Sequence, residues 1–413
     1  MELRISRLLA LLTVLALVAT ACSQQNTGVT AGEAPESLAS TEESEQQVVE
    51  ETGPALDRLI VAARGDINAS PLWIADAEGF FEQNGLEVDF LPVTDADELA
   101  ATMRQNLAQV AVESSATALN RIANNRADIS LIAYVDGTNG ADATRGTISL
   151  VAAGITDPDT TWTGCDLAGR RIGVDSATSL QAIALREMLR NSDCADTPIL
   201  DGSPQAPPAE AGEDSDAEQV DPADLDQVEG LELVEVDAIS LKGALQDGSL
   251  DGGVFAEPNT TRLLRENETG EKDVPVGIVA NLDQELCGTN RCANSVVVAS
   301  NTWIDNNEEV ASRFNAAIEQ SIQWILANEL DYRAALVSCC ALNTQDASDI
   351  PKPNFVGDEA NFFTEVNPII DVLVAQGKVT DRSRLNSSII RVCLLYTSPS
   401  PRDQRGSRMP SSA

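Results

Sequence analysis

The chain has 413 residues, 43% of them hydrophobic, which is enough for two or three globular domains. It carries 27 basic and 65 acidic residues, a balance that excludes a nucleic-acid partner because phosphate contacts require a basic face. It also has no histidine, which removes every Ser-His and Cys-His nucleophile pair and the most common metal ligand. We therefore expect no catalytic residues, no metal and no cofactor.

The amino-terminal segment, residues 1–22, has the pattern of a signal peptide: two arginines, the apolar run 8–19, then small residues. Small residues before Cys22 resemble the bacterial lipobox, in which the cysteine becomes the lipidated N-terminus, although Ala19 stands where that motif usually has Leu. Ordinary secretion with Cys22 lost or free is the alternative. Residues 23–56 are polar and lack Lys and Arg, which indicates a disordered tether.

The carboxyl-terminal segment 392–413, VCLLYTSPSPRDQRGSRMPSSA, changes abruptly to Ser, Pro and Arg. It resembles translated sequencing-adapter read-through, and we exclude it from the fold.

The middle of the chain alternates strand and helix patterns, which predicts an α/β fold. We expect one lobe from residues 57–155 plus 299–391 and a second from residues 156–298. The apolar strand 148–152 is assigned to the first sheet, and strand 296–298 closes the second lobe. Residues 196–229 hold eleven acids, five prolines and no base, which indicates a disordered acidic insert.

Eight cysteines in an exported chain favour disulfides. Cys287 and Cys292 are five residues apart, and Cys165 and Cys194 bracket the first βα unit of the second lobe. We expect both pairs to be bonded. The adjacent Cys339 and Cys340 have no obvious partner and stay unassigned.

Four segments carry a family resemblance. Residues 71–88, PLWIADAEGFFEQNGLEV, closely resemble the opening of the nitrate, sulfonate, taurine and thiamine-pyrimidine-precursor binding proteins, which are substrate-binding subunits of ABC importers. Residues 136–142, 166–174 and 255–258 resemble later segments of that family in the same order. The resemblance implies a type II periplasmic-binding-protein fold, with two α/β lobes, a two-strand hinge and a ligand in the cleft between them.

Ligands of open α/β sheets bind beyond the carboxyl ends of the strands. This rule selects the following ligand-binding candidates: Asp66, Asn68, Ser70, Ser114, Ser115, Asp136, Thr138, Ser176, Thr178, Ser179, Glu257 and Asn259.

The chemistry of these candidates points in two directions. The segment 176–179 places hydroxyls and backbone N–H groups at a helix N-terminus, which suits an anion, although simple helix capping explains it as well. Glu257 instead favours an amine, amidine or hydroxyl donor, so the two together suggest a zwitterion or a polar heterocycle. Trp73 and Trp162 could stack on a planar ligand, and Trp73 also suits a place in the core.

The sequence thus predicts a solute-binding lipoprotein, exported and anchored by lipid on the outer side of the cytoplasmic membrane. We expect a monomer that delivers a sulfonate, taurine, nitrate or pyrimidine-like solute to ABC permease subunits. A secreted enzyme or a sensory lipoprotein with the same fold is the alternative. A pyrimidine synthase among related folds uses a histidine, which this chain lacks.

Overall fold

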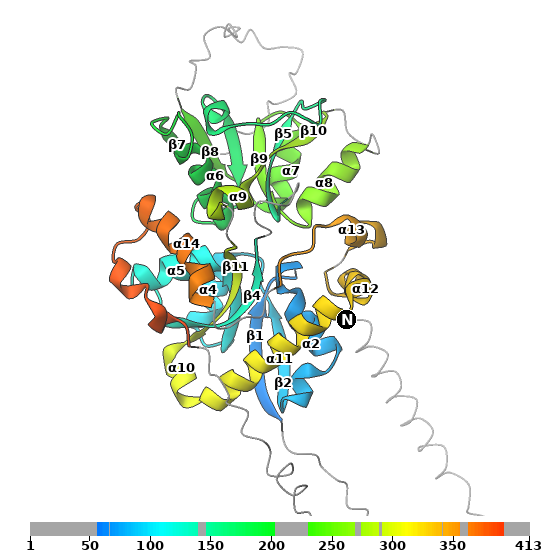
Figure 1. The fold of residues 1–413 in the computed structure, drawn as a ribbon, viewed down its shortest axis with the longest axis vertical. Coiled ribbons are helices and arrows are strands. Elements are labelled where there is room, and N and C mark those ends of the chain that lie inside the picture. The colour runs from blue at the N-terminus through cyan, green and yellow to red at the C-terminus, as the bar shows by residue number, and fades with distance from the viewer. Residues whose placement is uncertain are drawn as a thin grey trace, which may run out of the picture. The chain divides into compact units, whose positions relative to one another are not determined.

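The computed structural model describes residues 56–65, 67–138, 146–202, 230–268, 274–288, 291–340, 342–355 and 362–391. The predicted signal peptide, Cys22, the tether up to residue 55, segment 392–413 and residues 203–229 of the acidic insert lie outside the described residues. Figure 1 shows two separate sheets, each with its own helices. The predicted α/β class therefore agrees with the architecture.

The first lobe is built on a five-stranded sheet with the order β2-β1-β3-β11-β4. Its strands are β1 (Asp57–Ala63), β2 (Leu86–Pro92), β3 (Val110–Ser114), β4 (Ile129–Gly137) and β11 (Ala293–Ser300). Strands β2, β1 and β3 are parallel, whereas β11 runs antiparallel to both β3 and β4. Strand β11 therefore returns from a distant part of the sequence and is inserted between two early strands.

The second lobe is built on a six-stranded sheet with the order β10-β5-β9-β6-β8-β7. Its strands are β5 (Ile148–Ala153), β6 (Arg171–Val174), β7 (Ile199–Gly202), β8 (Leu231–Glu235), β9 (Gly252–Ala256) and β10 (Val276–Asn281). Strands β9, β6, β8 and β7 are parallel, and β5 and β10 form an antiparallel edge.

Two strand assignments from the sequence are wrong. Segment 148–152 belongs to the second sheet as β5, and segment 296–298 belongs to the first sheet as β11. Both are mostly apolar runs buried on two faces, and such a run identifies a strand without identifying its neighbours. In addition, all four residues of β7 fall inside the predicted acidic insert, where Ile199 and Leu200 pair with β8.

Helices cover the two sheets. Those of the first lobe are α2 (Ser70–Ala77), α3 (Phe80–Gln83), α4 (Ala96–Arg104), α5 (Ser115–Ala123), α10 (Asn301–Asn306), α11 (Glu308–Ala327), α12 (Glu329–Cys339), α13 (Thr344–Asp349) and α14 (Phe362–Ala375). Those of the second lobe are α6 (Leu180–Arg190), α7 (Ala238–Gln246), α8 (Asn259–Glu268) and α9 (Leu282–Cys287).

Local sequence explains where several of these helices begin. Ser114, Ser179 and Ser300 each accept a hydrogen bond from a backbone N–H of the first turn, at α5, α6 and α10 respectively. Helix α11 buries residues three or four apart, and its Phe314 stacks on Phe81 of α3 with ring centroids 5.4 Å apart. The long amphipathic helix therefore covers the first lobe, as its sequence pattern predicts.

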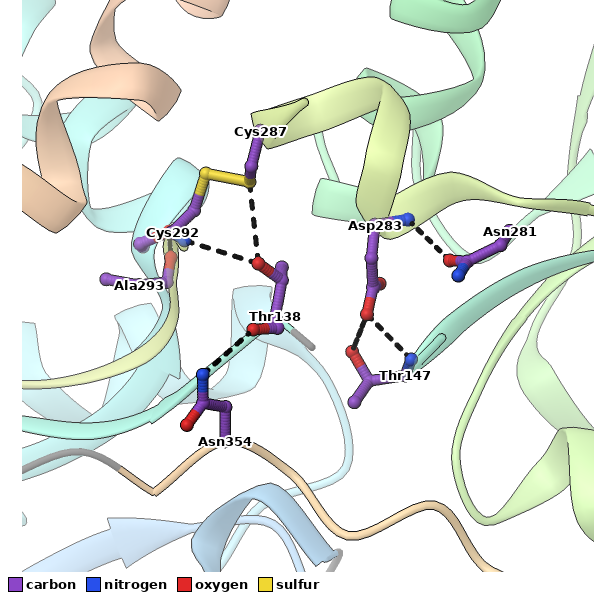
Figure 2. Close-up of a disulfide and its surroundings, with 9 residues drawn as sticks. Thr138, Thr147, Asn281, Asp283, Cys287, Cys292, Ala293 and Asn354 are labelled. Carbon is purple, nitrogen blue, oxygen red and sulfur yellow. Dashed lines mark hydrogen bonds between the residues drawn. A yellow bond between two sulfur atoms is a disulfide. The ribbon is translucent and has the colours of Figure 1, made fainter. Parts of the chain in front are cut away.

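The chain crosses between the sheets twice, once between β4 and β5 and once from β10 through α9 to β11. At the first-lobe end, the Thr138 N–H donates to the Cys292 carbonyl (3.0 Å), and the Cys292 N–H donates to the Thr138 hydroxyl (3.2 Å). At the second-lobe end, the buried Asp283 carboxylate accepts hydrogen bonds from the Thr147 N–H (2.8 Å), the Thr147 hydroxyl (3.0 Å) and the Ile148 N–H (3.0 Å). The two crossovers are thus joined at both ends (Figure 2).

Two glycines border the first crossover because nothing larger fits there. A Cβ atom on Gly137 would lie 2.0 Å from the Tyr134 hydroxyl and 2.8 Å from the Cys292 carbonyl oxygen. A Cβ atom on Gly146 would lie 2.0 Å from the Asn281 side-chain oxygen. Close approach of the second crossover therefore restricts both positions to glycine.

Three cysteine pairs are joined. Cys165 pairs with Cys194 and Cys287 pairs with Cys292, which are the pairs that their spacing favours. The Cys287–Cys292 bond closes the loop between α9 and β11, next to Thr138 (Figure 2). The structure also joins the adjacent Cys339 and Cys340 at the end of α12, a pair that sequence reasoning left unassigned.

We predict that Asp283→Ala lowers the free energy of unfolding by about 3 kcal/mol, because three buried donors lose their acceptor. Asp283→Asn should cost less, since its side-chain oxygen still accepts. Urea unfolding followed by circular dichroism measures both, with the exposed Gln284→Ala on the same helix as the control. Equal stability of Asp283→Ala and the control would contradict this role.

Candidate functional site

The carboxyl edge of each sheet adjoins the crossovers. Strand β4 ends at Gly137, directly before the first crossover, and β1 and β3 run in the same direction as β4. In the second sheet, β5 begins at Ile148, directly after the first crossover. Ile148 pairs with Ala256 at the carboxyl end of β9. Strands β6 and β8 are parallel to β9, so their carboxyl ends lie at the same edge. The topology therefore places most candidate residues of each lobe at the edge next to the crossovers.

Most predicted ligand-binding residues of the first lobe are buried and have hydrogen-bond partners within the fold. Asp66 lies outside the described residues, and Asn68 is half-buried in a short 3-10 helix at 67–69. The Ser70 hydroxyl is fully buried, 3.3 Å from that of Tyr332, and the Ser115 hydroxyl donates to the Ala293 carbonyl at 2.6 Å. Buried side chains with internal partners of this kind stabilise the lobe, and they give a ligand little to contact.

The remaining first-lobe candidates are Asp136, Thr138 and Ser114, of which the first two are fully buried. Asp136 is fully buried and accepts a hydrogen bond from Asn294 at 3.1 Å, while Thr138 holds the crossover. Ser114 is half-buried, caps α5 and lies 2.8 Å from the Thr117 hydroxyl. Of these three, only Ser114 retains surface at the sheet edge.

Arg64 is the site residue that sequence reasoning missed. It directly follows β1, is half-buried, and forms no hydrogen bond or ion pair with any described residue. The pKa of Asp95 is lowered mainly by the hydrogen bond from the Glu98 N–H, with a small contribution from the positive charge of Arg64, which also opposes the rise in the pKa of Glu113. Burial raises the Glu113 pKa overall, although Arg121 donates two hydrogen bonds to that carboxylate at 2.8 and 2.9 Å. Glu113 therefore has its own cation, and the Arg64 guanidinium is left for another anion.

In the second lobe, the predicted anion-binding turn at 176–179 already has acceptors for all of its N–H groups. The Ser176 N–H donates to Asp175 (3.0 Å), the Thr178 N–H to the Ser176 hydroxyl (3.3 Å), and the Ser179 N–H to the Ser176 carbonyl (3.1 Å). The Ala177 N–H donates to the carboxylate of Glu235. The turn also caps helix α6, as the alternative interpretation of the sequence predicts, because the Ser179 hydroxyl accepts a hydrogen bond from the Ala182 N–H.

Glu257 and Asn259 lie where β9 meets α8. Glu257 is 3% exposed, and its carboxylate accepts hydrogen bonds from the Thr261 hydroxyl (2.8 Å) and the Thr261 N–H (3.2 Å). Asn259 begins α8 and is half-buried. These contacts fix the Glu257 carboxylate at the carboxyl edge of the second sheet.

Neither tryptophan is a free stacking platform. Trp73 packs against the first-lobe core, with its ring centroid 4.3 Å from that of Phe90. Trp162 is half-buried beneath the Arg170 guanidinium, 4.0 Å from the ring centroid. Trp73 therefore has the place in the core that the sequence also allowed for it.

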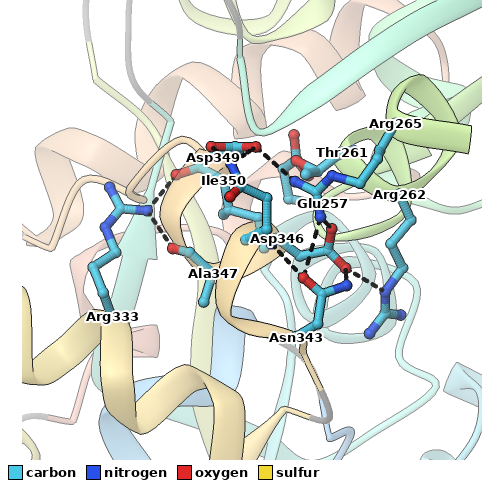
Figure 3. Close-up of polar contacts among 11 residues, drawn as sticks. Glu257, Thr261, Arg262, Arg265, Arg333, Asn343, Asp346, Ala347, Asp349 and Ile350 are labelled. Atoms are coloured by element: carbon cyan, nitrogen blue, oxygen red, sulfur yellow. Dashed lines mark hydrogen bonds and ion pairs between the residues drawn. The ribbon is translucent and has the colours of Figure 1, made fainter. Parts of the chain in front are cut away.

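Ion pairs join the lobes beside the crossovers, between α8 of the second lobe and α13 of the first (Figure 3). Arg265 contacts the buried Asp346 and donates to Asp349 at 2.6 Å, and Arg262 lies 3.9 Å from Asp346. Arg333 holds α13 from the other side by donating to the Ala347 carbonyl at 3.0 Å. We call Arg262, Arg265, Asp346 and Asp349 the α8–α13 ion cluster.

A second inter-lobe contact follows α14. Gln376, just after this helix, donates to the Ile183 carbonyl of α6 at 3.0 Å, and apolar residues of α5, α6, α9 and α14 share one buried cluster. A hollow of about 630 Å³ lies between α9 and α14. It is lined by residues such as Leu286, Arg291 and Glu365, and by none of the predicted ligand residues.

The described residues contain no group of three or more Cys, Asp or Glu side chains placed to hold a metal ion. They also contain no helix with the length and apolar character needed to cross a bilayer.

Comparison with known proteins now identifies the fold and the domain. Residues 66–198 match the family model described as NMT1/THI5 like. The chain contains an NMT1/THI5-like domain. A search of curated protein sequences finds no match to this chain.

Solved structures extend this similarity over most of the chain. The nitrate-binding protein NrtA from Synechocystis PCC 6803 is 12% identical, with a TM-score of 0.57 over 86% of this chain and 92% of that one. The alkanesulfonate-binding protein SsuA from Xanthomonas axonopodis pv. citri, bound to MOPS, is 12% identical, with a TM-score of 0.54 over 80% and 96%. The desulfurization enzyme DSZB is 14% identical, with a TM-score of 0.52 over 79% and 94%. The periplasmic-binding-protein fold and the resemblance expected from the sequence are therefore confirmed.

We predict that Arg265→Gln weakens the inter-lobe contact by about 1.5–3 kcal/mol, the usual contribution of hydrogen bonds to charged groups. Small-angle X-ray scattering of the ligand-free protein should then show a larger radius of gyration, because the lobes separate more often. Arg382→Gln is the control, since Arg382 pairs with Asp371 inside the first lobe. An Arg265→Asp/Asp349→Arg double variant should restore part of the contact, and an unchanged radius in Arg265→Gln would contradict the role of the cluster.

Proposed function

We propose that this protein is an extracytoplasmic solute-binding lipoprotein that captures a small polar organic solute or anion for an ABC importer. One observation carries the proposal: both sheets turn their carboxyl edges toward the same pair of crossovers, and Arg64 stands at one of these edges without an ion-pair partner among the described residues. The ligand binds between the two edges, with its anionic group at Arg64.

Arg64 suits this role for physical reasons. A guanidinium presents a planar set of donors that matches the oxygens of a carboxylate or a sulfonate. Its half-buried position reduces solvent screening, so a charge pair formed there is stronger than one on the open surface. Ser114 and Asn68, which lie at the same edge and retain surface, would add polar contacts.

The similar structures support an anionic group on the ligand. NrtA is named as a nitrate-binding protein, and SsuA as an alkanesulfonate-binding protein bound to MOPS. With identities of 12%, they support a class of solute and do not identify one.

The crossovers supply a hinge for capture. Rotation about two short segments lets the lobes close over a solute while each sheet stays rigid. Thr138 and Asp283 hold the two crossovers together at their two ends. Closure would then signal the loaded state to permease subunits.

Export and anchoring complete the proposal. The segment before Cys22 directs export, lipidation of Cys22 holds the protein at the outer side of the cytoplasmic membrane, and the acidic tether gives the binding lobes reach. We propose that the protein acts as a monomer.

An enzyme is the second candidate, because DSZB shares the fold. The absence of histidine from the whole chain argues against it, since no imidazole can serve as a general base. A binding protein returns its ligand unchanged, whereas an enzyme forms product.

The direct test is a thermal-shift screen of the purified protein against sulfonates, taurine, nitrate, pyrimidines and amino acids, followed by isothermal titration of each hit. We expect one solute per chain with a Kd of about 1 μM or lower, and stabilisation of about 2.7 kcal/mol at a hundredfold excess over Kd. No shift across a broad metabolite library, or conversion of a hit into product, would contradict the proposal.

Arg64→Ala should weaken the binding of the identified solute at least tenfold, because a charge-assisted hydrogen bond contributes about 1.5–3 kcal/mol. Its melting temperature without ligand should stay near that of the wild type, since Arg64 forms no hydrogen bond or ion pair with any described residue. Arg126→Ala is the matched control: this exposed arginine of the first lobe precedes the amino end of β4, at the opposite edge of the sheet. Equal weakening by both variants would show a general effect of net charge and would refute a site at Arg64.

A further inference from the structure

Glu235 occupies the place in the second lobe where an anionic ligand would be expected. It is the last residue of β8 and pairs in register with Val174, the last residue of β6. Its exposed side chain crosses to the turn at 176–179 and accepts the Ala177 N–H. Of the acceptors that serve the N–H groups of this turn, the Glu235 carboxylate alone comes from another strand.

The turn leads into α6, whose N-terminus carries a partial positive charge. A carboxylate bound there satisfies the same backbone group and the same dipole that would attract a ligand anion. Arg186 of α6 does not offer its positive charge to a ligand anion at the surface. It is 9% exposed and donates to the Ala177 carbonyl at 2.5 Å. Its guanidinium lies behind the turn and helps to hold it in place.

The rest of this edge adds negative charge. The Asp175 carboxylate is bound to the start of the same turn, and the Glu257 carboxylate is fixed at the neighbouring end of β9. Glu235 and Asp175 therefore present carboxylates at the edge of the second sheet, where the Glu257 carboxylate is buried, while the edge of the first sheet presents the guanidinium of Arg64.

We infer that Glu235 is a specificity-determining residue that excludes ligand anions from the turn at 176–179 and selects solutes with an ammonium or another N–H donor facing the second lobe. This inference rests on the proposed solute-binding function. It assigns the two ends of the ligand: the anionic end meets Arg64, and the cationic end meets Glu235. A zwitterion fits this arrangement, and a simple monoanion does not.

The first arm of the test examines the contact itself and needs no knowledge of the natural ligand. In ¹H–¹⁵N spectra of the wild-type protein, the Ala177 amide should not respond to ethanesulfonate. In Glu235→Ala, ethanesulfonate should shift the amide in a saturable way. An Ala177 amide that behaves alike in both proteins would overturn the inference.

The second arm measures selectivity with a matched pair of probes, taurine and ethanesulfonate, which differ in one ammonium group. We expect the wild type to bind taurine at least tenfold more tightly, and Glu235→Gln to lose most of this ratio. Asp237→Asn is the control: it removes a charge two residues away, where Asp237 accepts the Ser240 N–H, and should keep the ratio.

The outcomes separate this inference from the proposed function. Equal binding of both probes by the wild type, or loss of the ratio in Asp237→Asn as well, would overturn the role of Glu235 while leaving a solute-binding protein. Failure of both probes to bind any variant would also overturn it, and the metabolite screen then judges solute binding independently.

Discussion

The paired crossover is the constraint on which the rest of the structure depends. Strand β11 can lie between β3 and β4 only if the chain leaves the first lobe, completes the second and returns. The return passes so close to the outgoing segment that Gly137 and Gly146 cannot carry a side chain. Thr138 and Asp283 then bond the two segments together at either end. Because both sheets are attached at this one place, both of their carboxyl edges are directed to it.

Charge is divided between these edges. The first has a half-buried arginine, Arg64, and a buried acid, Glu113, that pairs with Arg121. The second has carboxylates, one of them bound at the start of α6. In a chain with 65 acidic and 27 basic residues, an acidic edge is unremarkable by itself, and the half-buried cationic charge at the other edge is the informative feature. The α8–α13 ion cluster adds an inter-lobe contact whose energy any opening of the lobes must overcome.

The alternation of strands and helices, most element positions and the family resemblance could be read from the sequence, because local periodicity and capping residues determine them. The partners of β5 and β11 could not be read from it, since a mostly apolar strand buried on both faces fits either sheet. The strand-end rule found the correct edges but could not separate Ser70, Ser115 and Thr138, which are buried in the fold, from residues with free surface. Arg64 is not among the sequence candidates because these were chosen for hydroxyl, amide and carboxylate groups. An arginine directly after the first strand was nevertheless visible in the sequence. Glu235 could not be found, because its contact joins two segments far apart in the sequence.

Native mass spectrometry of the purified protein, before and after incubation with a metabolite extract, tests the central claim most directly. The account predicts a single small-molecule adduct per chain, released unchanged when the protein is unfolded. A chain that binds nothing from the extract, or an extract in which a metabolite is consumed and a product appears, would contradict it.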